Sequence, residues 1–169
     1  FDIAVKEDFD YFCFHDVDML PITDDCDYSY EDEPIHLATE LESYDYKLPY
    51  PQYFGGVVLF SKEDFLKVNG YSNEYWGWGA EDDDIRRRLD AAKVLCQDWM
   101  TATKGIIWKR RDGHFLSLPH LGSNNPTHQQ NVNRLRSGYD YSEDGLSSLE
   151  YELISTEKRD GYTIHKVRL

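Results

Sequence analysis

Four consecutive acids follow two tryptophans and two glycines in the segment YWGWGAEDDDIRRRL, residues 75–89, and three arginines come after them. Acids are favoured in the first turn of a helix, where unpaired amides carry partial positive charge. Asp82, Asp83 and Asp84 each have an arginine four residues later, and each such pair stabilises a helix by about 0.2–0.5 kcal/mol. The sequence therefore predicts a helix over residues 80–95 with acids in its first turn.

The helical wheel separates one of these acids from the others. The apolar residues of the predicted helix form one buried stripe, and Asp82 lies nearest to it. We expect Asp82 to face inward beside Trp76 and Trp78, and Asp83 and Asp84 to lie at the surface. A carboxylate at the edge of a partly dry aromatic pocket is a candidate base or acceptor for sugar hydroxyls. Helix capping and a functional role both stay open for the acid run.

The length and net charge of the chain limit how many domains and which classes of partner it can have. The 169 residues are enough for one domain and too few for two, so we expect a single domain over residues 1–169. A net charge of −14 argues against binding to nucleic acid or to an anionic membrane. No stretch approaches the roughly 20 apolar residues of a membrane span. A phosphorylated substrate would need a local basic site or a divalent cation, and the many acids favour the cation.

Short apolar runs separated by turn residues indicate an α/β fold, with the site at the carboxyl edge of its sheet. A helix over residues 61–70 is expected to begin at the N-cap Ser61. Turn signals predict a strand pair around Asp112 and Gly113, and a hairpin around Asp160 and Gly161. The remaining expected strands are one at residues 11–14, buried on both faces, and two more at residues 35–43 and 53–60.

The DVD triplet at residues 16–18 follows the first apolar run. On an extended backbone Asp16 and Asp18 project from one face while Val17 packs on the other. Two carboxylates on one side attract a cation, although a polar strand end that enters a turn is the more common reading of this pattern. His120 ends a further apparent strand, and a lone histidine carries no assignment by itself.

Three segments resemble the β-1,4-galactosyltransferase family of GT-A fold glycosyltransferases, namely FHDVDMLP, LPYPQYFGGVVLFSKEDFLKVNGYSNEYWGWGAEDDDIRRRL and DGLSSLEYEL. Their order and spacing match the family as well as their composition. The resemblance implies a GT-A-like mixed sheet flanked by helices, without part of the N-terminal nucleotide-binding half. It also implies Mn²⁺-dependent, inverting transfer of galactose from UDP-galactose to the 4-hydroxyl of an acceptor sugar resembling N-acetylglucosamine or xylose.

The resemblance assigns roles to individual residues of this chain. Asp18 and His120 match metal ligands of the family, and Asp82 matches its catalytic base. Tyr53 stands where donor selectivity is set, and a bulky tyrosine there favours galactose over N-acetylgalactosamine. The other implied substrate-binding residues are Tyr50 and Asp83 for the acceptor, Trp78 for both sugars, Gly56 for the donor, and Asp16.

The chain also departs from the family pattern. Ala80 replaces a glycine before the acid run, and Ser117 stands where well-known members have a methionine metal ligand. The third protein ligand is therefore expected to be His114, a water molecule or nothing. The family strands that cradle uracil and ribose would precede Phe1, so we interpret the chain as the acceptor-side portion of a larger enzyme or as a reduced member.

Two alternatives stay open from the sequence. One is an N-acetylgalactosaminyl- or glucosyltransferase of the same fold, and the other is a non-catalytic carbohydrate-binding module that keeps the aromatic cleft. The compartment is also open. Three cysteines without metal-finger spacing fit free thiols in a reducing compartment, which favours a bacterial-type cytoplasmic enzyme. The Golgi lumen, where animal relatives work, is the alternative.

Overall fold

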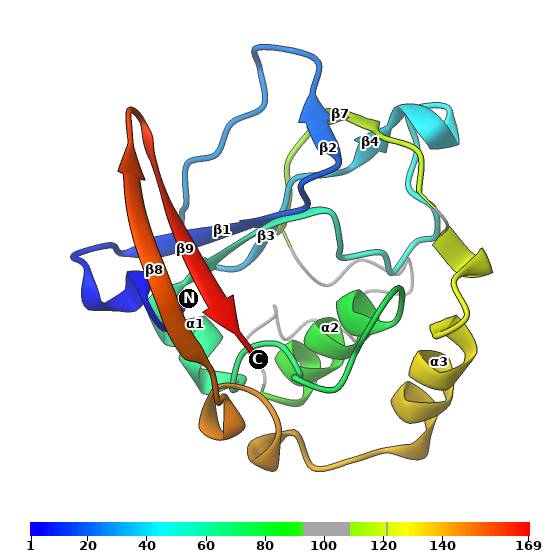
Figure 1. The fold of residues 1–169 in the computed structure, drawn as a ribbon. Coiled ribbons are helices and arrows are strands. Elements are labelled where there is room, and N and C mark those ends of the chain that lie inside the picture. The colour runs from blue at the N-terminus through cyan, green and yellow to red at the C-terminus, as the bar shows by residue number, and fades with distance from the viewer. Residues whose placement is uncertain (93–108, 121) are drawn as a thin grey trace.

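The computed structural model describes residues 1–92, 109–120 and 122–169 as a mixed α/β fold (Figure 1). Its strands are β1 Tyr11–His15, β2 Met19–Pro21, β3 Ile35–His36, β4 Glu40–Leu41, β5 Val57–Ser61, β6 Lys109–Arg110, β7 His114–Ser117, β8 Glu152–Arg159 and β9 Tyr162–Arg168. Its α-helices are α1 Lys62–Lys67, α2 Glu81–Ala91 and α3 His128–Ser137. Single 3-10 turns lie at Ala4–Lys6, Glu42–Tyr44, Gly122–Asn124, Tyr141–Glu143 and Leu146–Ser148.

The described strands form a four-stranded sheet in the order β1-β5-β3-β6, a three-stranded sheet in the order β2-β7-β4, and the β8-β9 hairpin. The four-stranded sheet is mixed, because β3 pairs antiparallel with β5 and parallel with β6. Helices α2 and α3 lie on one side of this sheet and the three-stranded sheet lies on the other (Figure 1). The predicted mixed sheet flanked by helices is confirmed.

Strand β5 is the centre of the core, because its successive side chains pack alternately into two apolar clusters. Val57 and Leu59 pack into the cluster shared with the three-stranded sheet, which includes Phe115. Val58 and Phe60 pack into the cluster shared with the helices. The second cluster also contains Phe54, Phe65, Val68, Ile85 and Leu89. The pattern of full burial on both faces therefore belongs to β5.

The prediction that residues 11–14 are buried on both faces is wrong. Among the described strands β1 pairs only with β5, so it lies at the sheet edge and alternates between exposed and half-buried residues. The predicted strand at residues 35–43 is divided into β3 and β4, which join different sheets. These strands interact with partners distant in the sequence, which local patterns do not reveal.

The strand pair predicted around Asp112 and Gly113 is not formed either. Strand β6 lies in the four-stranded sheet and β7 in the three-stranded one, so the two do not pair. Gly113 instead allows close approach of two backbones, because a β-carbon there would lie 2.2 Å from the carbonyl oxygen of Leu37. The glycine thus marks a point of contact between sheets.

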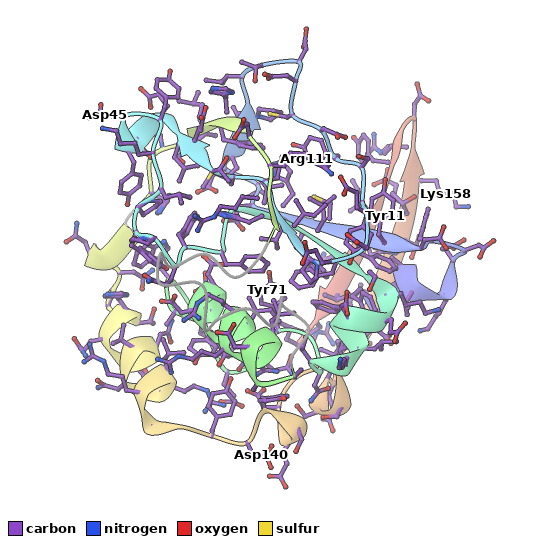
Figure 2. The ribbon with its side chains drawn as sticks, turned by 180° about the vertical axis from the view of Figure 1, so that it is seen from behind. Tyr11, Asp45, Tyr71, Arg111, Asp140 and Lys158 are labelled. Carbon is purple, nitrogen blue, oxygen red and sulfur yellow. The ribbon has the colours of Figure 1, made fainter. Side chains whose placement is uncertain are left out.

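The hairpin predicted around Asp160 and Gly161 is confirmed. Strands β8 and β9 pair antiparallel from Arg159 and Tyr162 onward, and every residue of both strands is exposed. In Figure 2 Lys158 lies on this hairpin at the periphery, whereas Tyr71 lies near the middle of the molecule. No helix of the described ranges is both long and apolar enough to cross a membrane.

Helices α1 and α2 begin differently. Helix α1 has the predicted N-cap, because the Ser61 hydroxyl accepts a hydrogen bond from the Asp64 amide at 3.0 Å. Helix α2 follows Ala80, which has a left-handed φ of 77° and makes no side-chain cap. Residues 93–95, the end of the predicted second helix, lie outside the described ranges.

Only one of the three ion pairs predicted along α2 is found, and it is buried. Arg88 Nε donates to Asp84 Oδ2 at 2.8 Å, and Asp84 is 4% exposed, so its prediction as a surface acid is wrong. Arg86 binds Asp90, and Arg87 donates to the carbonyl of Leu135. The predicted pairs of Asp82 with Arg86 and of Asp83 with Arg87 are therefore not formed.

Arg88 joins α2 to two distant segments. Its guanidinium is 1% exposed and donates to the carbonyl oxygens of Gly70 at 3.1 Å and Asp144 at 2.7 Å. It also donates to the Tyr139 hydroxyl at 2.8 Å. Because these groups follow α1 and α3 in the chain, one side chain positions α2 against both.

We expect Arg88→Met to lower the free energy of unfolding by about 3–5 kcal/mol, because removing one partner leaves the Asp84 charge buried without compensation. Urea denaturation followed by circular dichroism measures the change. Arg159→Met, which removes an exposed pair with Glu157, is the matched control and should cost at most about 1 kcal/mol. Equal losses in the two variants would contradict the anchoring role of Arg88.

Candidate functional site

An open cleft lies where six parts of the chain meet: the β1–β2 turn, the end of β4 with the 3-10 turn after it, the residues before β5, the start of α2, the end of β7 and helix α3. All but two of the site residues predicted from the sequence line this cleft, the exceptions being Gly56 and His114. Trp76, expected beside Asp82, is not part of the lining and is 58% exposed. Trp78 is the tryptophan that faces the cleft.

The DVD triplet forms a tight turn rather than an extended strand. The Met19 amide donates to the Asp16 carbonyl at 3.1 Å, which closes the turn between β1 and β2. Val17 is 97% exposed, so the expectation that it packs on an opposite face is wrong. The turn nevertheless brings both Asp16 and Asp18 to the cleft.

Pairing of β2 with β7 brings together two residues a hundred positions apart. Met19 lies opposite Ser117 in this antiparallel pair, and the Leu118 amide donates to the Asp18 carbonyl at 2.8 Å. This register carries the chain on to His120, whose Nδ1 lies 3.0 Å from Asp18 Oδ2. The two residues to which the resemblance assigns metal binding therefore lie side by side.

The Asp18 and His120 side chains fit a divalent cation. Neighbouring ligands of an octahedral ion, each about 2.1 Å from it, lie about 3 Å apart, as these two donor atoms do. A carboxylate oxygen and an imidazole nitrogen also suit Mn²⁺. Burial, together with Asp18 and Glu81, raises the pKa of Asp16 to about 6. A cation at this point would relieve the repulsion among these acids.

His114 does not join this pair, because its Nε2 contacts a carboxylate oxygen of Glu40 on the neighbouring strand β4. In the described part of the chain no group of three or more histidine, cysteine, aspartate or glutamate side chains is arranged to hold a metal. Ser117, which stands at the expected methionine position, donates its hydroxyl to Sδ of Met19 at 3.2 Å, and both residues line the cleft. The sequence offered no signal for Met19 as a lining residue.

Asp82 lies in the first turn of α2, with its carboxylate directly against Gly55. A β-carbon at Gly55 would lie 1.9 Å from Asp82 Oδ2, so only glycine leaves room for this side chain. Burial raises the pKa of Asp82 well above its usual value, and the charges of Glu81, Asp16 and Asp83 raise it further. Such a carboxylate is a stronger base than an exposed one.

Aromatic rings and polar groups form the rest of the cleft wall. The Tyr50 hydroxyl donates to Asp83 Oδ1 at 3.3 Å, and its ring packs edge-on against Tyr53 at 5.5 Å. Trp78 lies beside His120 and His128, with ring centroids 6.1 Å and 5.0 Å apart. His128 was not predicted, because a lone histidine at the start of a polar helix carries no signal. Flat faces beside hydroxyl acceptors suit a sugar ring.

The backbone that leads into α2 is strained at one residue. Gly77, Gly79 and Ala80 have φ values of 81°, 94° and 77°. This left-handed conformation costs a residue with a β-carbon about 1–2 kcal/mol. Ala80 therefore stands at a position that favours the glycine expected from the resemblance, and it does so directly before the acid run.

We expect Asp82→Asn to become progressively more stable than the wild type as the pH rises from about 4 to about 7. A raised pKa means that folding favours the protonated acid, so the stabilisation is greatest at low pH and is lost as the carboxyl ionises. Urea denaturation at several pH values measures the difference. Asp140→Asn is the control, because hydrogen bonds from Ser142 lower the pKa of Asp140, which predicts the opposite trend. A pH-independent difference for Asp82→Asn would contradict this environment.

Comparison with known proteins agrees with this geometry. Residues 35–107 match a family model described as the N-terminal domain of galactosyltransferase. The chain is 40% identical over 166 residues to β-1,4-galactosyltransferase 4 of Cricetulus griseus, covering 95% of this chain and 45% of the relative. It is 37% identical over 162 residues to β-1,4-galactosyltransferase 3 of Bos taurus, covering 93% and 38%. The chain thus spans less than half the length of these curated relatives.

Two solved structures share the fold. One is a mutant of Drosophila β-1,4-galactosyltransferase 7 in complex with manganese, UDP-Gal and xylobiose, with a TM-score of 0.67 and 26% identity. The other is the catalytic domain of that Drosophila enzyme with xylobiose, with a TM-score of 0.68 and 27% identity. Each match covers 95% of this chain and 68% of the solved chain. By sequence and by fold, this chain belongs to the β-1,4-galactosyltransferase family.

Proposed function

We propose that this chain forms the catalytic part of an inverting galactosyltransferase, which moves galactose from UDP-galactose to the 4-hydroxyl of an acceptor sugar. One observation carries the proposal: the Asp18–His120 pair and the half-buried Asp82 line the same cleft. The relatives named as β-1,4-galactosyltransferases support the reaction, and the solved complexes with xylobiose support an acceptor of xylose type. N-acetylglucosamine is the other acceptor that we propose.

Asp82 is the proposed base. Its carboxylate takes the proton of the acceptor hydroxyl while that oxygen forms a bond to the anomeric carbon of galactose. The bond from this carbon to UDP breaks on the opposite face, so the configuration is inverted. A raised pKa means that the Asp82 carboxylate binds a proton more tightly. Transfer of the proton from the acceptor hydroxyl to Asp82 is therefore more favourable.

The remaining lining residues are proposed to orient the two sugars. Asp83, already hydrogen-bonded to Tyr50, accepts hydroxyls of the acceptor, and Trp78 offers a flat face to both rings. Gly56 is proposed to let the backbone approach the donor, and Asp16, which lines the cleft, is proposed to contact the substrates. Positioning of this kind supplies a large part of the rate enhancement in a two-substrate transfer.

Asp18 and His120 are the residues that would hold Mn²⁺. A bound divalent cation would supply positive charge that offsets the charge of the departing diphosphate. The manganese in the solved Drosophila complex supports this choice of metal.

We expect Asp82→Asn to reduce galactose transfer by about 10²–10⁴-fold, because the amide cannot accept the proton. Release of UDP in the presence of Mn²⁺ and an acceptor measures the rate. UDP binding, followed by calorimetry, should be unchanged in this variant. The matched control is Asp90→Asn, which removes an acid of the same helix that pairs with Arg86 outside the cleft and should keep full activity.

Assays with other UDP-sugars and measurements of UDP binding distinguish the proposed function from the two alternatives. Transfer from UDP-N-acetylgalactosamine or UDP-glucose, but not from UDP-galactose, would identify a different transferase of the same fold. Sugar binding without Mn²⁺-dependent UDP binding would identify a carbohydrate-binding module. Unchanged turnover in Asp82→Asn would mean that another group is the base.

Donor selection is proposed to depend on Tyr53. Tyr53 is 9% exposed, and its hydroxyl lies 3.2 Å from the position that a β-carbon on Gly56 would take. The ring therefore fills the space beside Gly56. We expect Tyr53→Leu to raise the kcat/KM ratio for UDP-N-acetylgalactosamine over UDP-galactose by at least about tenfold, because the smaller side chain leaves room for the acetyl group. Tyr53→Phe, which keeps the ring, is the control. An unchanged ratio in Tyr53→Leu would contradict this role.

A further inference from the structure

The residues before β5 make a tight turn on which two cleft acids depend. The Val57 amide donates to the Gly55 carbonyl at 2.9 Å, and Gly56 has a φ of 76°. This is the geometry of a γ-turn with a positive central φ, which is rare and strained. Something outside the turn must therefore hold it in place.

Each acid contacts the turn in its own way. The Asp82 carboxylate rests against Gly55, where a β-carbon would stand within 2.9 Å of both of its oxygens. The Asp16 amide donates to the Gly56 carbonyl at 2.8 Å. A rotation of the peptide between Gly55 and Gly56 would therefore shift both acids.

His36 reaches the same turn from the core. Its Nε2 lies 2.9 Å from the Gly55 carbonyl oxygen, which can only accept, so Nε2 carries the proton. The ring is fully buried between Tyr53 and Phe54. Burial lowers the pKa of His36 to about 3, so the ring is neutral. The Gly55 carbonyl thus accepts from Val57 and His36 together, which fixes its direction.

Packing alone does not account for a histidine at this place. Its Nδ1 is buried and has no hydrogen-bond partner in the described part of the chain. Leaving an acceptor unpaired costs about 1–3 kcal/mol, and an apolar side chain would avoid this cost. The benefit of the histidine therefore lies in the hydrogen bond that Nε2 donates.

We propose that His36 is a positioning residue for the transfer reaction. It holds the Gly55 carbonyl from the buried side and so keeps the γ-turn in the shape that seats Asp82. The effect on turnover rests on the proposed function, whereas the effect on the turn does not.

The test compares His36→Gln with His36→Asn. The amide nitrogen of glutamine can take the place of Nε2, whereas that of asparagine is too short to reach Gly55. We expect kcat to fall about 10–100-fold in His36→Asn, with little change in the KM for the sugars, and to stay near the wild-type value in His36→Gln. Val68→Ala, a cavity variant in the cluster behind β5, controls for loss of stability alone.

Amide hydrogen exchange gives a readout that does not need activity. The amides of Val57 and Asp16 should exchange faster in His36→Asn than in His36→Gln and Val68→Ala, because these two amides donate to the turn. Equal turnover and equal exchange in the glutamine and asparagine variants would overturn the proposal. Absence of transfer in the wild type would remove the proposed function, and the exchange rates would still decide the role of His36.

Discussion

The buried guanidinium of Arg88 is the interaction on which the arrangement of the site depends. It joins α2 to the segment after α1 through Gly70 and to the segment after α3 through Asp144. Because the first turn of α2 carries Asp82, these contacts determine where that carboxylate can lie. A buried ion pair adds little net stability compared with apolar packing, but it strongly disfavours other arrangements once a partner is lost. Arg88 therefore contributes chiefly to the position of the helix.

Features governed by neighbouring residues could be predicted from the sequence. The N-cap at Ser61 and the hairpin at Gly161 follow from the conformations that these residues favour locally, and both are found. Asp18, His120 and Asp82 also lie in one cleft. No local sequence pattern links these three residues, and only the resemblance to a family indicated that they act together. The chemical roles of these residues remain proposals.

Features governed by distant contacts could not be predicted. The spacing of Asp84 and Arg88 indicated a pair, yet its burial depends on Tyr139 and Asp144, which cover it from elsewhere in the chain. Asp112 and Gly113 carry a strong turn signal, and the glycine is instead required where two sheets meet. His36 looked like any core histidine, because only the structure reveals that its ring reaches Gly55. The partners that decide the surroundings of Asp84 and Gly113 lie at least 50 residues away in the sequence. The partner of His36, Gly55, is only 19 residues away.

The antiparallel register of β2 and β7 has a consequence for how chains of this kind can vary. The spacing of Asp18 and His120 is set by the pairing of Met19 with Ser117, and not by the number of residues that connect the two strands. Insertions and deletions between the strands therefore leave the two donor atoms together as long as the pairing is kept. A single-residue slip within either strand, in contrast, would turn every following side chain to the opposite face and separate them. Evolution can lengthen the connections freely here, but it cannot shift the strands.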